Sequence, residues 1–250
     1  SEARRLYQSS LDVYRRLASD HGDRFQGIQN RRHLTEVLQS WEGDPPPAPR
    51  LGWVLLMEGA EAIEDPGEVA AWYEAGVRIL GPAWTGTRFT GGTHEPGPLT
   101  KEGRSLLRAM DEVGMALDLS HMTDEGQNQA LDTFGGVILS SHSNVRALLR
   151  GCPTPERHLS DEIIRRIAER QGVIGVMLYN PFLKAGWKPA DGRETVPLGR
   201  VLEHIDYICQ CTGSARHVAI GSDFDGGLGL HKIPAGLDSV ADLRFIGDGL

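Results

Sequence analysis

The chain of 250 residues is 40% hydrophobic and 24% charged, which is typical of a soluble globular protein and excludes a disordered or collagen-like chain. Its 34 acidic residues outnumber its 26 basic residues, so the formal net charge is -8. Because nucleic-acid-binding proteins concentrate positive charge, we predict no nucleic-acid partner. The sequence contains no apolar run long enough to cross a membrane, and its first residues lack the apolar core of a secretory signal.

The three cysteines, Cys152, Cys209 and Cys211, are an odd number and form no C-x-x-C pair. This usage suits a reducing compartment better than a disulfide framework, so we predict a cytoplasmic protein without a membrane partner. A symmetric homodimer is the default oligomer.

The first forty residues are predicted to be helical, with an apolar stripe that includes Leu6, Leu11 and Leu17 and a shorter helix over residues 34–38. The proline-rich segment 45–49 excludes helix and central strand, and it is interpreted as a stiff connection. The remainder of the chain shows one repeating pattern.

Six short apolar runs alternate with amphipathic segments from Trp53 onward. The predicted strands are 53–57, 77–80, 115–119, 137–139, 173–177 and 218–220, and the predicted helices are 66–73, 101–113, 125–131, 161–169 and 198–209, with Thr100, Thr123 and Ser160 as helix caps. Alternation of this kind indicates parallel strands joined by helices. Since the strands are almost continuously apolar, they are expected to be buried on both faces, in a doubly wound sheet or a (β/α)8 barrel.

Reactive side chains follow the predicted strands at the point where each strand ends. These residues are Glu58, His121, His142 and Asp223. In a (β/α)8 TIM barrel the carboxyl ends of all strands meet at one mouth, whereas an open sheet would spread them along an edge. Carboxylate and imidazole groups are the ligands that zinc and similar ions prefer. Either histidine alone is more often a packing residue, but four ligand-type residues at equivalent positions favour a metal site in a barrel.

Sequence motifs of other catalytic classes are absent: there is no G-x-S-x-G, no G-x-x-x-x-G-K-[ST], no G-x-G-x-x-G and no H-E-x-x-H. The segment 223–226 partly matches a calcium loop but lacks its third acidic position and its closing glutamate.

Several segments resemble the membrane (renal) dipeptidases, peptidase family M19, which are metal-dependent amidohydrolase-like barrels. They are MEGAEAI (57–63), GVRIL (76–80), GPLTKEGRSLLRAMDEVGMALDLSH (97–121), ILSSHSNVRAL (138–148), RHLSDEIIRRIAERQGVIGV (157–176) and HVAIGSDFDGG (217–227). The resemblance implies a dipeptidase with two zinc ions that uses a metal-bridged hydroxide and often tolerates a D-residue at the carboxyl end of its dipeptide substrate.

The resemblance also implies a role for individual residues. Glu58 is expected to bridge the two metals, and His121 and His142 to bind the second one. Asp223 is expected to accept a proton from the attacking water and pass it to the leaving amine. Arg157 is expected to bind the substrate carboxylate, for which its planar guanidinium is suited. Without the resemblance, a surface ion pair between Arg157 and Asp161 is the simpler interpretation.

The chain departs from the family pattern at its N-terminal end and at residue 84. No H-x-D pair that could supply two ligands of the first metal follows a strand before Glu58, and six predicted strands are two short of a closed barrel. We therefore expect residues 1–250 to form a single metal-dependent hydrolase barrel domain that lacks its first two strands and is truncated at both ends. In addition, Trp84 stands where the family often has a substrate-polarising histidine; it is expected to line the substrate site, but it cannot accept a proton.

The predicted function is therefore a zinc-dependent dipeptidase. Two alternatives stay open, because a fold and its metals do not fix the substrate. One is a related amidohydrolase that acts on N-acyl amino acids or lactones. The other is a degenerate barrel without catalytic activity.

Overall fold

The computed structural model describes all residues from Ser1 to Leu250, and its strands form two parallel sheets. A two-stranded sheet pairs β1 with β2, and a six-stranded sheet has the order β3-β4-β5-β6-β7-β8. The strands are β1 Phe25–Gly27, β2 Leu51–Trp53, β3 Leu55–Glu58, β4 Val77–Gly81, β5 Ala116–Asp118, β6 Ile138–Ser140, β7 Val173–Val176 and β8 Val218–Ile220. Each strand of the larger sheet pairs in parallel with the next one in sequence, so all of their carboxyl ends lie on the same side of the sheet.

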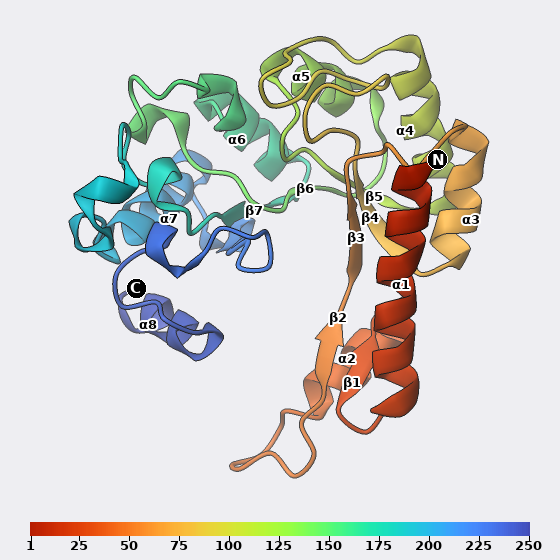
Figure 1. Ribbon diagram of the computed structural model, residues 1–250, viewed down its shortest axis with the longest axis horizontal. Helices are drawn as coiled ribbons and strands as arrows, with labels where there is room; N and C mark the ends of the chain where they lie inside the picture. Colours follow the sequence, from red (N-terminus) through yellow and green to blue (C-terminus); the bar gives the residue numbers. More distant parts are fainter.

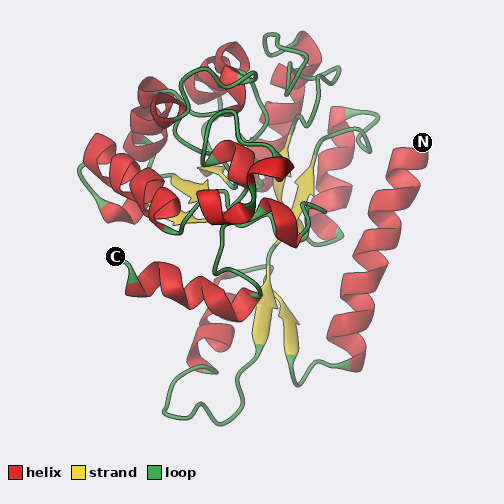
Figure 2. Ribbon diagram, turned by 60° about the vertical axis from the view of Figure 1, so that its left-hand side comes forward, coloured by secondary structure: helices red, strands yellow, loops and turns green.

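Helices connect the strands of the larger sheet and surround them (Figures 1 and 2). The α-helices are α1 Glu2–Asp20, α2 Arg31–Gln39, α3 Val69–Glu74, α4 Lys101–Val113, α5 Asp124–Thr133, α6 Asp161–Glu169, α7 Gly199–Thr212 and α8 Arg244–Asp248. The prediction of an α/β fold built from parallel strands and helical crossovers is confirmed. Within this chain β3 and β8 lie at the two ends of the six-stranded order.

The capping side chains explain why two helices begin where they were predicted. The Thr100 side chain accepts a hydrogen bond from the backbone N–H of Gly103 at 3.0 Å, and that of Ser160 accepts one from Ile163 at 3.3 Å. Thr123 also lies at a helix start, but its hydroxyl does not cap α5 and instead donates to the carbonyl of Gly97.

Three local predictions were wrong or incomplete. The segment 66–73 begins as a 3-10 turn, Pro66–Glu68, before α3. The predicted strand 53–57 is split at Val54 into β2 and β3. The strand β1 was not predicted at all, and the first forty residues are two helices with this strand between them.

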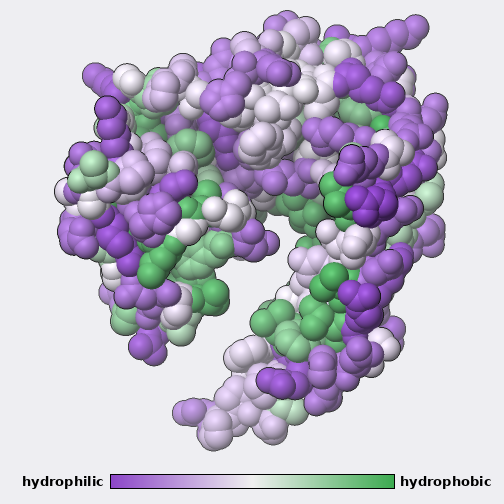
Figure 3. Space-filling view, viewed as in Figure 1, coloured by the Kyte–Doolittle hydropathy of each residue, from purple (hydrophilic) through white to green (hydrophobic).

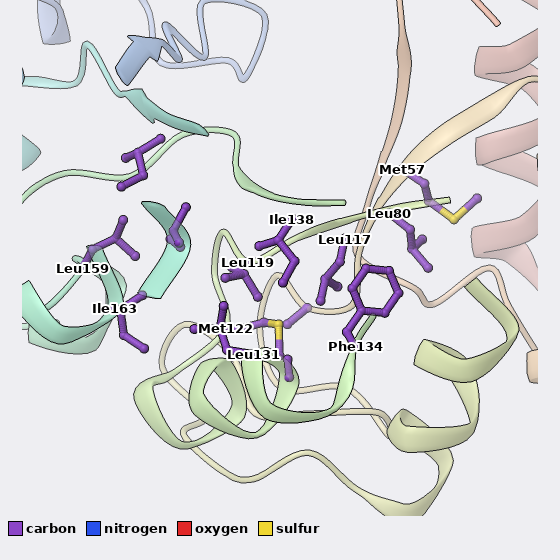
Figure 4. Close-up of a cluster of buried hydrophobic side chains, with 14 of the residues drawn as sticks. Met57, Leu80, Leu117, Leu119, Met122, Leu131, Phe134, Ile138, Leu159 and Ile163 are labelled. Carbon is purple, nitrogen blue, oxygen red and sulfur yellow. The ribbon is translucent and has the colours of Figure 1, made fainter. Parts of the chain in front are cut away.

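The hydrophobic core lies between the six-stranded sheet and the helices around it (Figure 4). Leu80, Leu117 and Ile138 come from three adjacent strands and are paired in register, and all are fully buried. Leu131 and Phe134 cover them from the end of α5. Burying a side chain of this size stabilises the fold by about 2 kcal/mol, so this layer fixes the strands whose ends carry the polar residues.

The N-terminal elements extend from the main body as an arm that carries α1, α2, β1 and β2 (Figure 1). Figure 3 shows a deep hollow between this arm and the C-terminal part of the chain, with hydrophobic side chains on the arm facing it. None of the helices has the combination of length and hydropathy that a membrane span needs.

Candidate metal centre

Three side chains converge at the carboxyl ends of neighbouring strands. Glu58 is the last residue of β3, His121 follows β5, and His142 follows β6. The Nε2 atoms of the two histidines lie 2.9 Å apart, and Glu58 Oε1 lies 3.1 Å from His121 Nε2 and 3.2 Å from His142 Nε2. The structure thus brings together the three residues that the sequence predicted as metal ligands.

The spacing of these three atoms fits a divalent metal ion. In a tetrahedral site with metal–ligand distances of about 2.0–2.1 Å, neighbouring ligand atoms lie about 3.4 Å apart. The observed separations of 2.9–3.2 Å are slightly shorter, so a small outward movement forms one face of such a tetrahedron. Two imidazoles and a carboxylate are also a donor set that suits zinc. Glu58, His121 and His142 therefore fit a metal ion.

The protonation states at this cluster are those that a metal site needs. Burial lowers the pKa of His121 to about 4, so its imidazole is neutral at pH 7. The two imidazoles beside Glu58 hold the pKa of its carboxyl well below the usual range, so Glu58 is ionised. Neutral imidazole and ionised carboxylate are the forms that bind cations.

Local backbone structure fixes the ends of the strands. The Tyr7 hydroxyl of α1 donates to the backbone carbonyl of Glu58 and lies 3.2 Å from that of Gly59, which connects the N-terminal helix to the end of β3.

His121 and Asp223 have positive φ values of 68° and 54°. This left-handed conformation costs a residue with a side chain about 1 kcal/mol, and such strain is concentrated at functional sites.

Asp223 lies on the same side of the sheet as the cluster, after β8. It lines a cavity of about 380 Å³ together with Glu58, Ser141 and His142, at the gap between β3 and β8. Burial raises the pKa of the Asp223 carboxyl, and the negative charges of Glu58 and Asp225 add to this effect. A carboxyl with a raised pKa can hold a proton closer to neutral pH, which suits a proton-transfer group.

Arg157 is almost completely buried, with 4% of its surface exposed. Its guanidinium donates to the backbone carbonyl of His142 at 3.0 Å and to the hydroxyl of Ser143 at 3.3 Å, and it lies 3.3 Å from His121 Nε2. Burial lowers its pKa to about 10, so it remains charged at pH 7. A second cavity, of about 340 Å³, lies against Arg157 and His121.

The alternative interpretation of Arg157 as the partner of Asp161 is wrong. The Asp161 carboxylate instead accepts hydrogen bonds from Tyr207 and lies 3.8 Å from Arg165. Arg157 is a buried cation beside the metal cluster, whereas Asp161 lies at the start of α6 and contacts Tyr207 of α7.

Trp84 lies beside the same cluster from the loop after β4. Its ring centroid is 5.8 Å from that of His121, the two planes are inclined by 35°, and 53% of the tryptophan remains exposed. The indole therefore covers one face of His121 and offers its other surface to solvent or to a bound molecule.

Sequence reasoning missed three polar residues at this site. Thr93 contacts the ring of His121, and Ser141 contacts the ring of His142 and the buried carboxylate of Asp118. Asp118 and Ser141 stand directly within the DLSH and SSHS segments, so their closeness to the histidines was a signal. Thr93 lies 28 residues from His121, and nothing in the sequence indicates that contact.

Comparison with known proteins identifies the family. The sequence profile of the membrane dipeptidases, peptidase family M19, matches residues 1–248. The chain belongs to this family. The resemblance that the sequence suggested is therefore confirmed, and with it membership of a family of metal-dependent dipeptidases.

Individual relatives agree with this assignment. The chain is 37% identical to an uncharacterised protein from the pqqA 5' region of Klebsiella pneumoniae, over 77% of this chain and 70% of that protein. It is 35% identical to an uncharacterised dipeptidase of Schizosaccharomyces pombe, over 57% of this chain but only 32% of that protein.

A solved structure of a Rhodobacter sphaeroides metallopeptidase, bound to a phosphinate mimic of the dipeptide L-Ala-D-Ala, superposes with a TM-score of 0.74 at 27% identity, over 91% of this chain and 62% of that one. The M19 dipeptidase AC superposes with a TM-score of 0.83 at 25% identity, over 99% of this chain and 70% of that one.

Proposed function

We propose that this M19 chain is a zinc-dependent dipeptidase that hydrolyses the peptide bond of dipeptides and tolerates a D-residue at their carboxyl end. The observation that carries the proposal is the convergence of Glu58, His121 and His142 within 3.2 Å of one another, next to the buried cation Arg157. The dipeptide mimic bound by the Rhodobacter relative supports the choice of substrate.

Glu58, His121 and His142 are the residues that would hold the metal. The Glu58 oxygen Oε1 faces both histidines, and its carboxylate would be the ligand shared by the two zinc ions that the family implies. When bound, zinc supplies a Lewis acid that polarises the scissile carbonyl and makes water acidic enough to yield hydroxide near neutral pH.

The other residues of the site bind substrate and move protons. Asp223, with its raised pKa, accepts the proton of the attacking water and returns it to the leaving amine. Arg157 attracts the carboxylate of the dipeptide, and the cavity against it provides space for the carboxyl-terminal residue. Trp84 forms an apolar wall above His121.

Trp84 is also the observation that favours the second candidate, an amidohydrolase that acts on N-acyl amino acids or lactones. An indole can pack against an acyl chain, but it has no lone pair with which to accept a proton. A site walled by Trp84 in place of a histidine therefore accommodates an apolar acyl group as well as an amino-terminal residue.

Hydrolysis of L-Ala-D-Ala, L-Ala-L-Ala and N-acetyl-D-alanine by the zinc-loaded protein distinguishes the two candidates. We expect both dipeptides to be cleaved, N-acetyl-D-alanine to be left intact, and a chelator to abolish activity that added zinc restores. Cleavage of the N-acyl substrate alone would replace the dipeptidase with the amidohydrolase, and zinc-independent cleavage would contradict both.

A further inference from the structure

Each histidine of the cluster faces Glu58 with its Nε2 atom, so the state of its Nδ1 atom decides whether it can bind a metal. A neutral imidazole carries its proton on one of the two nitrogens and a lone pair on the other. Only a ring with the proton on Nδ1 offers the Nε2 lone pair to a cation. The hydrogen-bond partner of Nδ1 therefore determines whether the imidazole adopts the tautomer that can bind a metal through Nε2.

The Nδ1 atom of His142 lies 2.8 Å from the hydroxyl of Ser141. That hydroxyl has a single proton, which it donates to Oδ2 of Asp118 at 2.5 Å. The Ser141 oxygen can therefore only accept from Nδ1–H, and the lone pair of His142 lies on Nε2.

Asp118 is well suited to hold the Ser141 hydroxyl in this orientation. It is 1% exposed, and its Oδ1 accepts hydrogen bonds from the backbone N–H groups of Ser120 at 3.0 Å and Ser141 at 2.9 Å. The neighbouring strands approach closely here, since a Cβ added to Gly175 or Gly221 would lie 1.9 or 2.1 Å from the Ser141 carbonyl oxygen. The backbone of Ser141 is therefore held by the Asp118 carboxylate at its N–H and packed closely against Gly175 and Gly221 at its carbonyl.

An independent contact fixes the ring of His121. Its Nδ1 lies 2.9 Å from the hydroxyl of Thr93, and its Nε2 lies 3.3 Å from the guanidinium of Arg157. A guanidinium can only donate, which favours a lone pair on Nε2, whereas the ionised carboxylate of Glu58, 3.1 Å from the same nitrogen, can only accept. When a metal ion takes the Nε2 lone pair, the proton lies on Nδ1, and the Thr93 hydroxyl can accept it.

The loop that carries Thr93 is tied to Trp84. The backbone N–H of Thr93 donates to the carbonyl of Trp84 at 2.9 Å. The preceding Gly92 allows this close approach, because a Cβ there would lie 2.3 Å from the carbonyl oxygen of Thr85. His121 is therefore held between the indole of Trp84 and the hydroxyl of Thr93, both from one loop.

We propose that Thr93 and Ser141, with Asp118 behind Ser141, are positioning residues that fix the tautomers of His121 and His142 and so set the metal affinity of the site. The inference rests on the proposed metal-binding function. Loss of such an outer hydrogen bond typically weakens metal binding by about 10- to 100-fold.

Two substitutions remove the hydroxyls with little change in shape: Thr93→Val and Ser141→Ala. The chain offers a matched control for each. Thr90 lies in the same loop as Thr93 and its buried hydroxyl has no hydrogen-bond partner, so Thr90→Val removes a hydroxyl without loss of a contact. Ser140 is a buried neighbour whose hydroxyl bonds to Ser143 and Ser120 but to neither imidazole, so Ser140→Ala is the control for Ser141→Ala.

The measurement is the zinc dissociation constant of each protein, by competition with a chromophoric chelator, beside the Tm of the metal-free form. We expect Thr93→Val and Ser141→Ala each to bind zinc about 10- to 100-fold more weakly than the wild type, with Thr93→Ser, Thr90→Val and Ser140→Ala close to the wild type. We expect the Tm values of the metal-free proteins not to rank the variants in the order of their zinc affinities.

Equal zinc affinity in the wild type and in all of these variants would overturn the inference while leaving the metal site in place. The inference would also be overturned if zinc affinity fell in proportion to Tm in controls and test variants alike, since the hydroxyls would then act only through stability. A wild-type protein that binds no zinc would overturn the proposed function itself, and with it this inference.

Discussion

His158 and His204 are two buried histidines outside the metal cluster, and they make the stability of the protein sensitive to acid. Each is 1% exposed. Burial, with the nearby charge of Arg157, lowers the pKa of His158 to about 3, and burial with the charge of Arg200 lowers that of His204 to about 4. In addition, His204 Nδ1 accepts a hydrogen bond from the backbone N–H of Val145 at 3.1 Å, which only the neutral ring can do.

The sign of the effect follows from the lowered pKa values. An unfolded histidine has a pKa of about 6.5, so below that pH the unfolded chain binds protons that the folded chain does not. The free energy of unfolding is therefore unaffected by these groups above pH 7 and falls as the pH drops from about 6.5 toward their folded pKa values. Between pH 7 and pH 5, the loss is about 2 kcal/mol for each of His158 and His204.

Urea unfolding at pH 7 and pH 5 measures this loss in the wild type and in His204→Gln, whose amide oxygen can still accept from Val145. We expect the free energy of unfolding of the variant to fall by about 2 kcal/mol less than that of the wild type. The exposed His231 provides the control, because His231→Gln should behave as the wild type does. An equal loss in His204→Gln and the wild type would refute the reasoning.

Three further substitutions test the substrate site and the core. Arg157→Lys keeps the charge but loses the planar guanidinium. The value of kcat/KM for dipeptides should therefore fall about 10- to 100-fold more than that for dipeptide amides, which lack the carboxylate. An equal fall for both substrates would show that Arg157 does not bind the carboxylate. Trp84→Ala should raise KM about 3- to 10-fold, and an unaltered KM would show that Trp84 does not line the substrate site. Leu117→Ala, at a fully buried position, should lower the free energy of unfolding, measured with urea, by about 2–5 kcal/mol. Leu148→Ala should lower it much less, because Leu148 is 38% exposed. An equal decrease in both variants would contradict the position of the core.

The elements that could be predicted are those whose signals are local. The helices 101–113 and 161–169 were predicted with the bounds that the structure gives them, since each combines an amphipathic pattern with a capping side chain. β1 could not be predicted, because the three residues Phe25–Gly27 carry no strand pattern. They form a strand only by parallel pairing with β2, which lies more than twenty residues further along the chain.

In the candidate site, too, the residues with a local sequence signal could be predicted, and those that depend on tertiary contacts could not. Glu58, His121 and His142 were found because each lies at the carboxyl end of a strand or directly after it, and the parallel order of the sheet brings these ends together. The burial of Arg157 and its separation from Asp161 depend on how the loop before α6 folds back over the cluster, which no sequence period encodes. The contact of Thr93 with His121 depends in the same way on a glycine-rich loop whose path is set by tertiary packing.

The most direct test of the metal site is the zinc content per chain of freshly purified protein, measured for the wild type and for Glu58→Gln. The substitution preserves the shape of the side chain but removes the charge that faces both histidines at 3.1 and 3.2 Å. We expect zinc in the wild type, little or none in Glu58→Gln, and a parallel loss of L-Ala-D-Ala hydrolysis. A wild-type protein without zinc, or a Glu58→Gln protein that retains both zinc and activity, would contradict the assignment of Glu58, His121 and His142 as the metal centre.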